Sequence, residues 1–188
     1  MYLIGNKAIS ASKNRINYKL KNKVLDKYIN LIKKNKKIIL KQNIKDIKLA
    51  NRKKLKKNLI DRLTIDQKKL NSICNAIKNV RNLKDPTDVT LEKWKRPNKL
   101  LIKRVSIPLG VIGVIFESRP NVASDISSLC FKSGNAVILR GGSEAINSNK
   151  ILVALFRKAL KMNKVNPNYV QLIEKKDRSY VNFMLSNM

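Results

Sequence analysis

Two short polar segments follow apolar runs in the middle of the chain, and their residue types suit the binding of an anionic ligand. The first follows Val111 to Phe116 (VIGVIF), whose continuous apolar character predicts a strand buried on both faces of a parallel sheet. In open α/β sheets, ligands bind beyond the carboxyl ends of the strands. The polar residues gathered there are Glu117, Ser118, Arg119 and Asn121. They form a binding loop, or a plain connecting turn in which Asn121 caps the next helix, and the same residues could do both.

The second segment follows Ala136 to Leu139 (AVIL), a second predicted buried strand, and a helix is expected after it. Its residues are Arg140, Gly141, Gly142, Ser143 and Glu144. Glycines between a strand and a helix let a ligand approach the backbone, and the helix N-terminus favours anions. Arg140 can offer a fork of donors to a phosphate or to ribose hydroxyls. Neither a G-x-G-x-x-G nor a Walker pattern is present, so a tight turn without a ligand is the alternative.

The two cysteines, Cys74 and Cys130, both lie on apolar helical stripes. Their neighbours on these stripes are Leu70, Ile73, Ile77 and Val80 for Cys74, and Val122, Ile126 and Leu129 for Cys130. This spacing predicts buried core residues rather than nucleophiles, and the chain has no histidine to activate a thiol. Two thiols without a secretory leader do not form a disulfide framework, so a reducing, cytoplasmic location is expected. No metal site is predicted.

The first 86 residues are expected to be helical. An apolar stripe at helical period supports this, and its members are Leu20, Val24, Leu25, Tyr28, Ile29 and Ile32. The segment Thr64 to Gln67 fits a capping box, in which the Thr hydroxyl and the Gln amide satisfy the first free N–H groups of a helix. Asp85-Pro86 is expected to end that helix, because proline disfavours the helical conformation in the residue before it.

The remaining residues predict a β-hairpin and then an α/β layer. Residues 89–107 hold the short segments LEKWK and KLLIKRVSI around an Arg-Pro-Asn turn, which is typical of a hairpin arm. Residues 108–188 alternate strand and helix, with Gly134 ending the first helix. Tyr169 to Glu174 (YVQLIE) is expected to be a third strand and Lys176 to Met188 a helix. The fold class predicted is α/β: a Rossmann-like parallel sheet with a helical N-terminal region and a hairpin arm.

The chain is strongly basic, with 42 Lys and Arg against 12 Asp and Glu and a formal net charge of +30. One interpretation is a nucleic-acid or anionic-membrane partner. The other is solvated helix faces rich in lysine, since the lysines are scattered among Leu and Ile at helical spacing. Aromatic residues make up only 5%, too few for base-stacking platforms. No run reaches membrane-spanning length, so neither a membrane partner nor specific nucleic-acid binding is expected.

The central motifs carry a family resemblance. The stretches LGVIGVIFESRPNV and LCFKSGNAVILRGGSEA resemble the γ-glutamyl phosphate reductases, also called glutamate-5-semialdehyde dehydrogenases, of the aldehyde dehydrogenase superfamily. Weaker similarity extends over nearly the whole chain, through LIDRLTID, the RPN turn of the hairpin and DRSYVNFML. The chain resembles only the N-terminal portion of those enzymes, and the resemblance implies that residues 1–188 are the first part of an NADP-binding domain.

The resemblance implies a reaction and a set of residue roles. The reaction is NADPH-dependent reduction of L-glutamyl 5-phosphate to L-glutamate 5-semialdehyde with release of phosphate, in proline biosynthesis. A cysteine thiolate attacks the acyl phosphate, and the resulting thioester receives hydride from NADPH. The segment from Arg140 to Glu144 would hold the adenosine ribose of NADP(H), with Arg140 suited to a 2′-phosphate. The segment from Glu117 to Asn121 would lie near the reacting carbonyl, where either Asn121 binds the oxyanion or Arg119 meets a substrate carboxylate or phosphate.

The resemblance also implies what lies outside this chain. The nucleophilic cysteine is expected downstream of Met188, in a catalytic domain that these residues do not include. We therefore expect the chain alone to lack reductase activity, to expose a sheet edge and an apolar face, and to fold poorly. Full-length relatives are expected to form homo-oligomers through such hairpins, which makes Trp94 and Leu100 to Ile102 candidate contacts. Glutamate 5-kinase is the implied pathway neighbour.

Two other functions stay open at this point. The chain is either a non-catalytic remnant or split-enzyme partner that binds a dinucleotide, or a nucleic-acid-binding protein that uses its charge. Binding that vanishes with modest salt would reflect charge alone.

Overall fold

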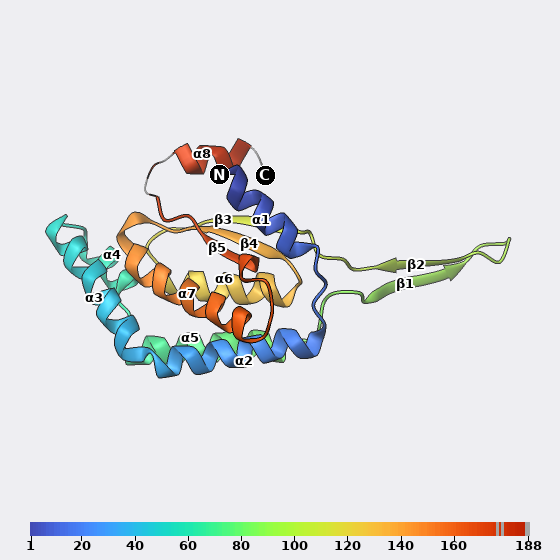
Figure 1. Ribbon diagram of the computed structural model, residues 1–188, viewed down its shortest axis with the longest axis horizontal. Helices are drawn as coiled ribbons and strands as arrows, with labels where there is room; N and C mark the ends of the chain where they lie inside the picture. Colours follow the sequence, from blue (N-terminus) through green and yellow to red (C-terminus); the bar gives the residue numbers. More distant parts are fainter. Residues whose placement is uncertain (176, 178, 187–188) are drawn as a thin grey trace.

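A computed structural model describes residues 1–175, 177 and 179–186. It contains a three-stranded parallel sheet in the order β3-β4-β5. The strands are β3 Val111–Ile115, β4 Ala136–Arg140 and β5 Val170–Leu172. The crossovers are α6 Pro120–Lys132 and α7 Ile146–Met162, which cover one face of the sheet (Figure 1). The predicted Rossmann-like α/β architecture is confirmed for these residues, and β3 and β5 are its two edges.

The N-terminal region is helical, as predicted. Its helices are α1 Tyr2–Ser12, α2 Tyr18–Lys34, α3 Lys36–Arg52, α4 Lys57–Leu63 and α5 Gln67–Asn82. Helices α2 and α5 pack beneath α6 and α7 as a second layer, whereas α1 lies on the opposite face of the sheet (Figure 1). The apolar stripe of α2 is largely buried against the neighbouring helices α5, α6 and α7. Its Tyr28 hydroxyl shares a buried hydrogen bond of 2.8 Å with the hydroxyl of Ser124 on α6.

The two central strands differ in burial. Every residue of β4 is buried, as predicted. The prediction that VIGVIF is buried on both faces is wrong, because alternate residues of β3 are exposed and Ile115 keeps 44% of its surface accessible. At this edge of the sheet the helices cover β3 only partly. The expected exposed apolar surface is therefore present at Ile115, whereas β5, the strand beyond which the sheet was expected to be cut short, is largely buried.

Two of the predicted helix ends are corrected by the structure. The capping box from Thr64 to Gln67 is wrong, since the Thr64 hydroxyl donates to the carbonyl of Ile60 and so belongs to the end of α4. The N-cap of α5 is Asp66, whose carboxylate accepts from the backbone N–H of Lys69 at 2.6 Å. Helix α5 ends at Asn82, before the expected Asp85-Pro86 stop.

At the end of α6 the prediction holds. Gly134 has a φ of +78°, a conformation that suits glycine at this position. A Cβ there would lie 2.9 Å from the ring of Pro108, so close packing adds a second reason for glycine.

The C-terminal elements are shorter than expected. A 3-10 turn at Pro167–Tyr169 delays the third strand, which runs only from Val170 to Leu172 rather than from Tyr169 to Glu174. The predicted final helix is confirmed as α8 Ser179–Ser186. Residues 176, 178, 187 and 188 of that prediction lie outside the described residues. No helix in the described part of the chain is long and apolar enough to cross a membrane.

The predicted hairpin is confirmed as β1 Thr90–Lys95 paired antiparallel with β2 Leu101–Val105. It extends away from the body of the molecule (Figure 1). All six residues of β1 are exposed, and Trp94, opposite Ile102 in the register, keeps 43% of its surface accessible. An exposed antiparallel pair of this kind is marginal by itself, so its position depends on what holds its base.

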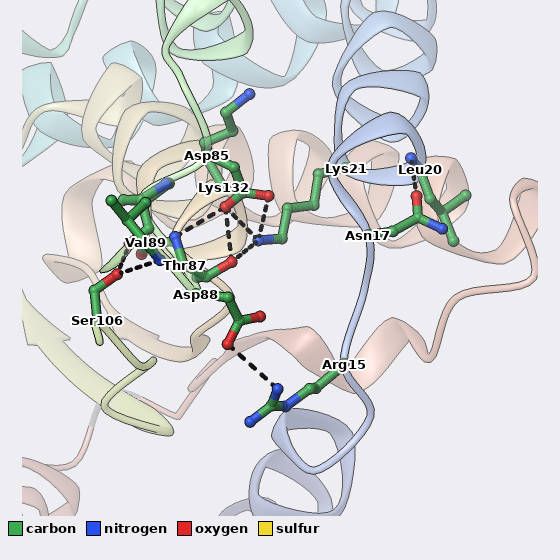
Figure 2. Close-up of polar contacts among 12 residues, drawn as sticks. Arg15, Asn17, Leu20, Lys21, Asp85, Thr87, Asp88, Val89, Ser106 and Lys132 are labelled. Atoms are coloured by element: carbon green, nitrogen blue, oxygen red, sulfur yellow. Dashed lines mark hydrogen bonds and ion pairs between the residues drawn. The ribbon is translucent and has the colours of Figure 1, made fainter. Parts of the chain in front are cut away.

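A buried ion pair holds the segment that leads into the hairpin. The ammonium of Lys21 on α2 donates to both carboxylate oxygens of Asp85, at 2.9 and 3.1 Å, and to the hydroxyl of Thr87 at 3.1 Å (Figure 2). The Lys21 side chain is only 2% exposed. Beside it, Ser106 accepts from the N–H of Val89 and donates to the carbonyl of Pro86, which joins the two strands of the hairpin at their base.

Replacing Lys21 with methionine should destabilise the chain by roughly 3 kcal/mol, because the partly buried Asp85 carboxylate loses its counter-charge. Burial alone would raise the pKa of Asp85, but the hydrogen bonds from Lys21 and Thr87 outweigh it and hold the pKa below its usual 3.8. The pair therefore stabilises the fold above about pH 4, and its contribution is lost as the pH falls through the lowered pKa. Urea unfolding from pH 3 to pH 7 measures this.

The double variant Lys21→Met/Asp85→Leu is the matched control, since it removes both charges. It should recover most of the lost stability and should lack this part of the pH slope. A Lys21→Met protein as stable as the parent at pH 7 would contradict the role of the pair.

Candidate functional site

The loops that follow β3 and β4 meet at the carboxyl end of the sheet. The hydroxyl of Ser118 in the first loop donates to the carboxylate of Glu144 in the second, in a short hydrogen bond. The backbone N–H of Phe116 donates to the carbonyl of Arg140 at 3.0 Å, which continues the pairing of the strands into the loops. The structure therefore brings together the two polar segments singled out in the sequence.

Glu144 lies in a 3-10 turn, Ser143–Ala145, just before α7. Burial would raise the pKa of Glu144, but hydrogen bonds from Ser118, from its own backbone N–H and from Ser143 outweigh it and lower the pKa. The group is therefore an ionised carboxylate at neutral pH. A carboxylate has about four acceptor sites, and these three hydrogen bonds leave capacity for a further donor such as a ribose hydroxyl.

The two glycines of the second loop lie in tight surroundings. A Cβ on Gly142 would lie 2.3 Å from Glu144 Oε1, and one on Gly141 would lie 2.3 Å from Asn149 Nδ2 and 3.0 Å from Phe116 Cζ. A side chain at either position would therefore push Glu144, Asn149 or Phe116 out of the place that it holds here. Beside the loop, the amide of Asn149 on α7 is fully buried and has no hydrogen-bond partner among the described residues. A glycine backbone beside an ionised acceptor fits the hydroxyl groups of a nucleotide ribose.

Arg140 is placed differently from the expectation. Its side chain is only 8% exposed, and the guanidinium donates to the carbonyl of Gly141 in a short hydrogen bond. In this structure Arg140 supports the backbone of its own loop, and it is not displayed on the surface.

The N-terminus of α7 is already occupied by a carboxylate from another helix. Asp46 of α3 accepts from the backbone N–H groups of Asn147 and Ser148, at 3.1 and 2.7 Å. It also accepts from the side chains of both residues, at 2.8 and 2.7 Å. The anion that this helix terminus favours is therefore the protein's own Asp46. A phosphate at this terminus, as the strand–Gly-Gly–helix pattern suggested, would have to displace it.

Sequence reasoning missed Asp46, although a signal was present. Ile39, Asn43, Asp46 and Ala50 recur at helical spacing and share the buried face of α3. Two polar residues on an otherwise apolar stripe indicate buried hydrogen bonds. Asn43 uses its amide accordingly: it donates to the carbonyl of Leu63 and to the hydroxyl of Ser148, and it accepts from the N–H of Ile65.

The loop after β3 borders a hollow of ≈ 340 Å³. Its lining includes Glu117, Ser118 and Arg119 from the loop and Arg62 from α4, which the sequence analysis did not single out. The prediction that Asn121 caps α6 is wrong: α6 starts at Pro120 with Arg119 as N-cap residue, and the Asn121 amide donates to Asp125 within the helix. The reason is that proline occupies the first helical position, where its fixed φ suits the helix and its missing N–H costs nothing.

Both cysteines are buried core residues, as predicted. Burial raises the pKa of Cys74, and it raises the pKa of Cys130 to about 11. At neutral pH both are therefore thiols rather than thiolates. Neither lines the hollow beside the β3 loop, so neither is placed to attack a ligand there.

Known proteins resemble this chain in sequence over most of its length. The γ-glutamyl phosphate reductase of Clostridium tetani is 45% identical over 188 residues, covering 98% of this chain and 44% of the relative. That of Caldanaerobacter subterraneus subsp. tengcongensis is 45% identical over 165 residues, covering 88% and 40%. No protein-family model matches the chain. The chain spans about two fifths of the length of the curated relatives that it matches.

Solved structures show the same similarity in fold. The crystal structure of γ-glutamyl phosphate reductase from Thermotoga maritima matches with a TM-score of 0.95 and 37% identity, over 98% of this chain and 45% of that one. The chain belongs to the γ-glutamyl phosphate reductase family. An acetylating aldehyde dehydrogenase from Geobacillus thermoglucosidasius, 11% identical with a TM-score of 0.74, shares the fold over 99% of this chain and 39% of its own. The γ-glutamyl phosphate reductase match thus covers both loops and the hairpin.

Replacing Asp46 with asparagine should cost about 3 kcal/mol of folding stability, because one carboxylate oxygen becomes an amide that faces donors of α7. Asp61→Asn is a matched control on exposed α4, and it should change stability by less than about 0.5 kcal/mol. Thermal unfolding by circular dichroism compares the two. Equal melting temperatures for Asp46→Asn and the parent chain would refute the assignment of Asp46 as the cap of α7.

Proposed function

We propose that this chain supplies the nucleotide-binding part of an NADPH-dependent reductase that converts L-glutamyl 5-phosphate to L-glutamate 5-semialdehyde and phosphate. The observation that carries the proposal is the Ser118–Glu144 hydrogen bond, which unites the two predicted ligand loops at the carboxyl end of a parallel sheet. Family membership gives the reaction. The reductases named above are more than twice as long as this chain, so the proposal concerns the whole enzyme.

Within the proposal, each loop has its own task. Ser143 and Glu144 accept hydroxyl groups of the adenosine ribose, Gly141 and Gly142 let the nucleotide reach the backbone, and Arg140 holds the loop in shape. Ser118 fixes Glu144 in position. When bound, NADPH supplies the hydride.

The loop after β3 serves the substrate in this proposal. Asn121, in the first turn of α6, lies next to the developing negative charge of the acyl phosphate, and Glu117 and Arg119 contact the rest of the substrate. The thiolate of the reaction comes from a segment other than these 188 residues, because Cys74 and Cys130 are buried thiols. Two free thiols also suit a reducing cytoplasm. Phosphoryl transfer from ATP to a carboxylate gives an acyl phosphate, and glutamate 5-kinase is the proposed source of this one.

We also propose that the hairpin joins copies of the enzyme. Both of its strands are exposed, and Trp94, Leu100 and Leu101 present apolar surface far from the body of the chain. An exposed, apolar strand pair favours association with another chain. Trp94→Lys should therefore lower the mass of the full-length enzyme in sedimentation, whereas Ile44→Lys on exposed α3 should leave it unchanged. An unchanged mass for Trp94→Lys would contradict this use of the arm.

The cofactor assignment is tested by titrating the chain, after circular dichroism has shown that it is folded, with NADPH and with NADH in an isothermal calorimeter. Glu144→Gln should weaken NADPH binding about tenfold, which is about 1.4 kcal/mol, because it removes an ionised acceptor for the ribose. Glu174→Gln, on the surface beside Lys150, is the control and should bind like the parent chain. A chain that binds neither nucleotide, or a Glu144→Gln variant with full affinity, would refute the assignment. The chain alone should oxidise no NADPH when an acyl phosphate is added.

A further inference from the structure

The hollow between α4 and the loop after β3 gathers positive charge from two parts of the chain that lie far apart in sequence. Arg62 contributes from α4 and Arg119 from the loop, and Glu117 adds one carboxylate to the same lining. Leu59, Phe116 and Val122 supply apolar lining. In the described ranges, neither Arg62 nor Arg119 forms an ion pair through its guanidinium. The hollow is therefore lined by two exposed guanidinium groups, neither of which is paired with a carboxylate of the described residues.

The backbone at Arg62 and at the two residues after it is held by hydrogen bonds. Lys69 of α5 donates through its ammonium to the carbonyls of Arg62 and Thr64, at 2.8 and 2.9 Å. The next residue, Leu63, is buried, and its carbonyl accepts from Asn43 at 2.9 Å. Such anchoring reduces the conformational freedom that a binding side chain must give up on contact with a ligand.

Lys69 lies behind this hollow rather than in its lining. Burial lowers the pKa of Lys69, and the nearby positive charge of Arg119 lowers it further, against the opposing effect of Asp66. The Lys69 ammonium is already occupied by the carbonyls of Arg62 and Thr64. The positive charge that a ligand in the hollow would meet therefore comes from Arg62 and Arg119.

We propose that Arg62 and Arg119 together bind the α-carboxylate of the substrate, while Glu117 faces its α-ammonium group. A guanidinium offers parallel donors that match a carboxylate in a two-pronged contact. A carboxylate beside an ammonium is the head of an amino acid, and a lining of two guanidinium groups and one carboxylate has the complementary charge pattern. Arg62 is thus a specificity-determining residue for a substrate that carries an amino-acid head. This inference rests on the proposed function for the identity of the substrate.

The substrate carries negative charge at two ends, the α-carboxylate and the acyl phosphate. The following experiment tells which of the two binds to Arg62 and Arg119. The chain is titrated with L-glutamate, with glutarate, which lacks the ammonium, and with inorganic phosphate, while amide shifts are followed by NMR. L-Glutamate should bind with shifts in Glu117, Arg119 and residues of α4, and glutarate should bind about fivefold more weakly. Phosphate binding that depends on Arg62, together with equal affinities for glutarate and L-glutamate, would overturn the assignment to the amino-acid head.

Variants test the role of Arg62 itself. Arg62→Gln should weaken L-glutamate binding at least tenfold. The affinity of Arg62→Lys should lie between those of the parent chain and Arg62→Gln, because lysine keeps the charge but loses the two-pronged contact. Arg104→Gln on the hairpin removes the same charge far from the hollow and should bind like the parent chain. Full affinity in Arg62→Gln, or an equal loss in Arg104→Gln, would refute the proposal.

NADPH binding is measured on the same samples. It should be unchanged in Arg62→Gln, which shows that the nucleotide loop is intact. A parent chain that binds L-glutamate through Arg62 but no NADPH would refute the cofactor proposal and leave this one standing.

Discussion

One buried carboxylate, that of Asp46, fixes where α7 begins and so where the loop after β4 must run. Its two oxygens accept four hydrogen bonds from Asn147 and Ser148. A carboxylate without these donors would be too costly to bury, and the first N–H groups of α7 would be unsatisfied without it. Because α3 supplies the group, the helical N-terminal region cannot shift without moving the second ligand loop.

The same network also reaches the hollow beside the loop after β3. Asn43 joins the hydroxyl of Ser148 to the backbone at Leu63 and Ile65, and that backbone leads directly to Arg62. The loop after β4 and the hollow are therefore supported by neighbouring residues on one face of α3. Buried polar networks of this kind specify a single arrangement when every member is satisfied.

The basic composition also has a partly structural use. Lys21 and Lys132 are almost fully buried, and both have partners: Lys21 binds Asp85, and Lys132 donates to Asn22 and to the carbonyl of Arg81. Lys132 also lies 4.2 Å from the centre of the Tyr18 ring. These cations join helices to each other and to the hairpin base, and they are unavailable to a polyanion. The remaining lysines lie mainly on exposed helix faces.

Local patterns in the sequence predicted the elements but few of their long-range partners. The apolar period located α2 and α5, and the runs VIGVIF and AVIL located β3 and β4, because these signals come from adjacent residues. The strand-end rule also brought Ser118 and Glu144 to one edge. Asp46 and Arg62 could not be assigned in this way, since their neighbours Ser148 and Arg119 lie more than 50 residues away. The cap errors at Thr64 and Asn121 have separate causes: Asp66 takes the N–H of Lys69 at the start of α5, and proline at the first position of α6 makes Arg119 the N-cap residue.

The short hydrogen bond between Ser118 and Glu144 ties the loop after β3 to the loop after β4, so that a movement of one loop affects the other. If Glu144 receives a ribose hydroxyl, its position and charge change at the point where Ser118 donates to it. Ser118 is bonded to Arg119 along the backbone, and Arg119 is both the N-cap residue of α6 and part of the lining of the hollow. One hydrogen bond and one peptide unit therefore join the carboxylate of Glu144 to Arg119. If nucleotide and substrate bind as proposed, any coupling carried by this link must be reciprocal, so that each ligand changes the affinity for the other by the same factor.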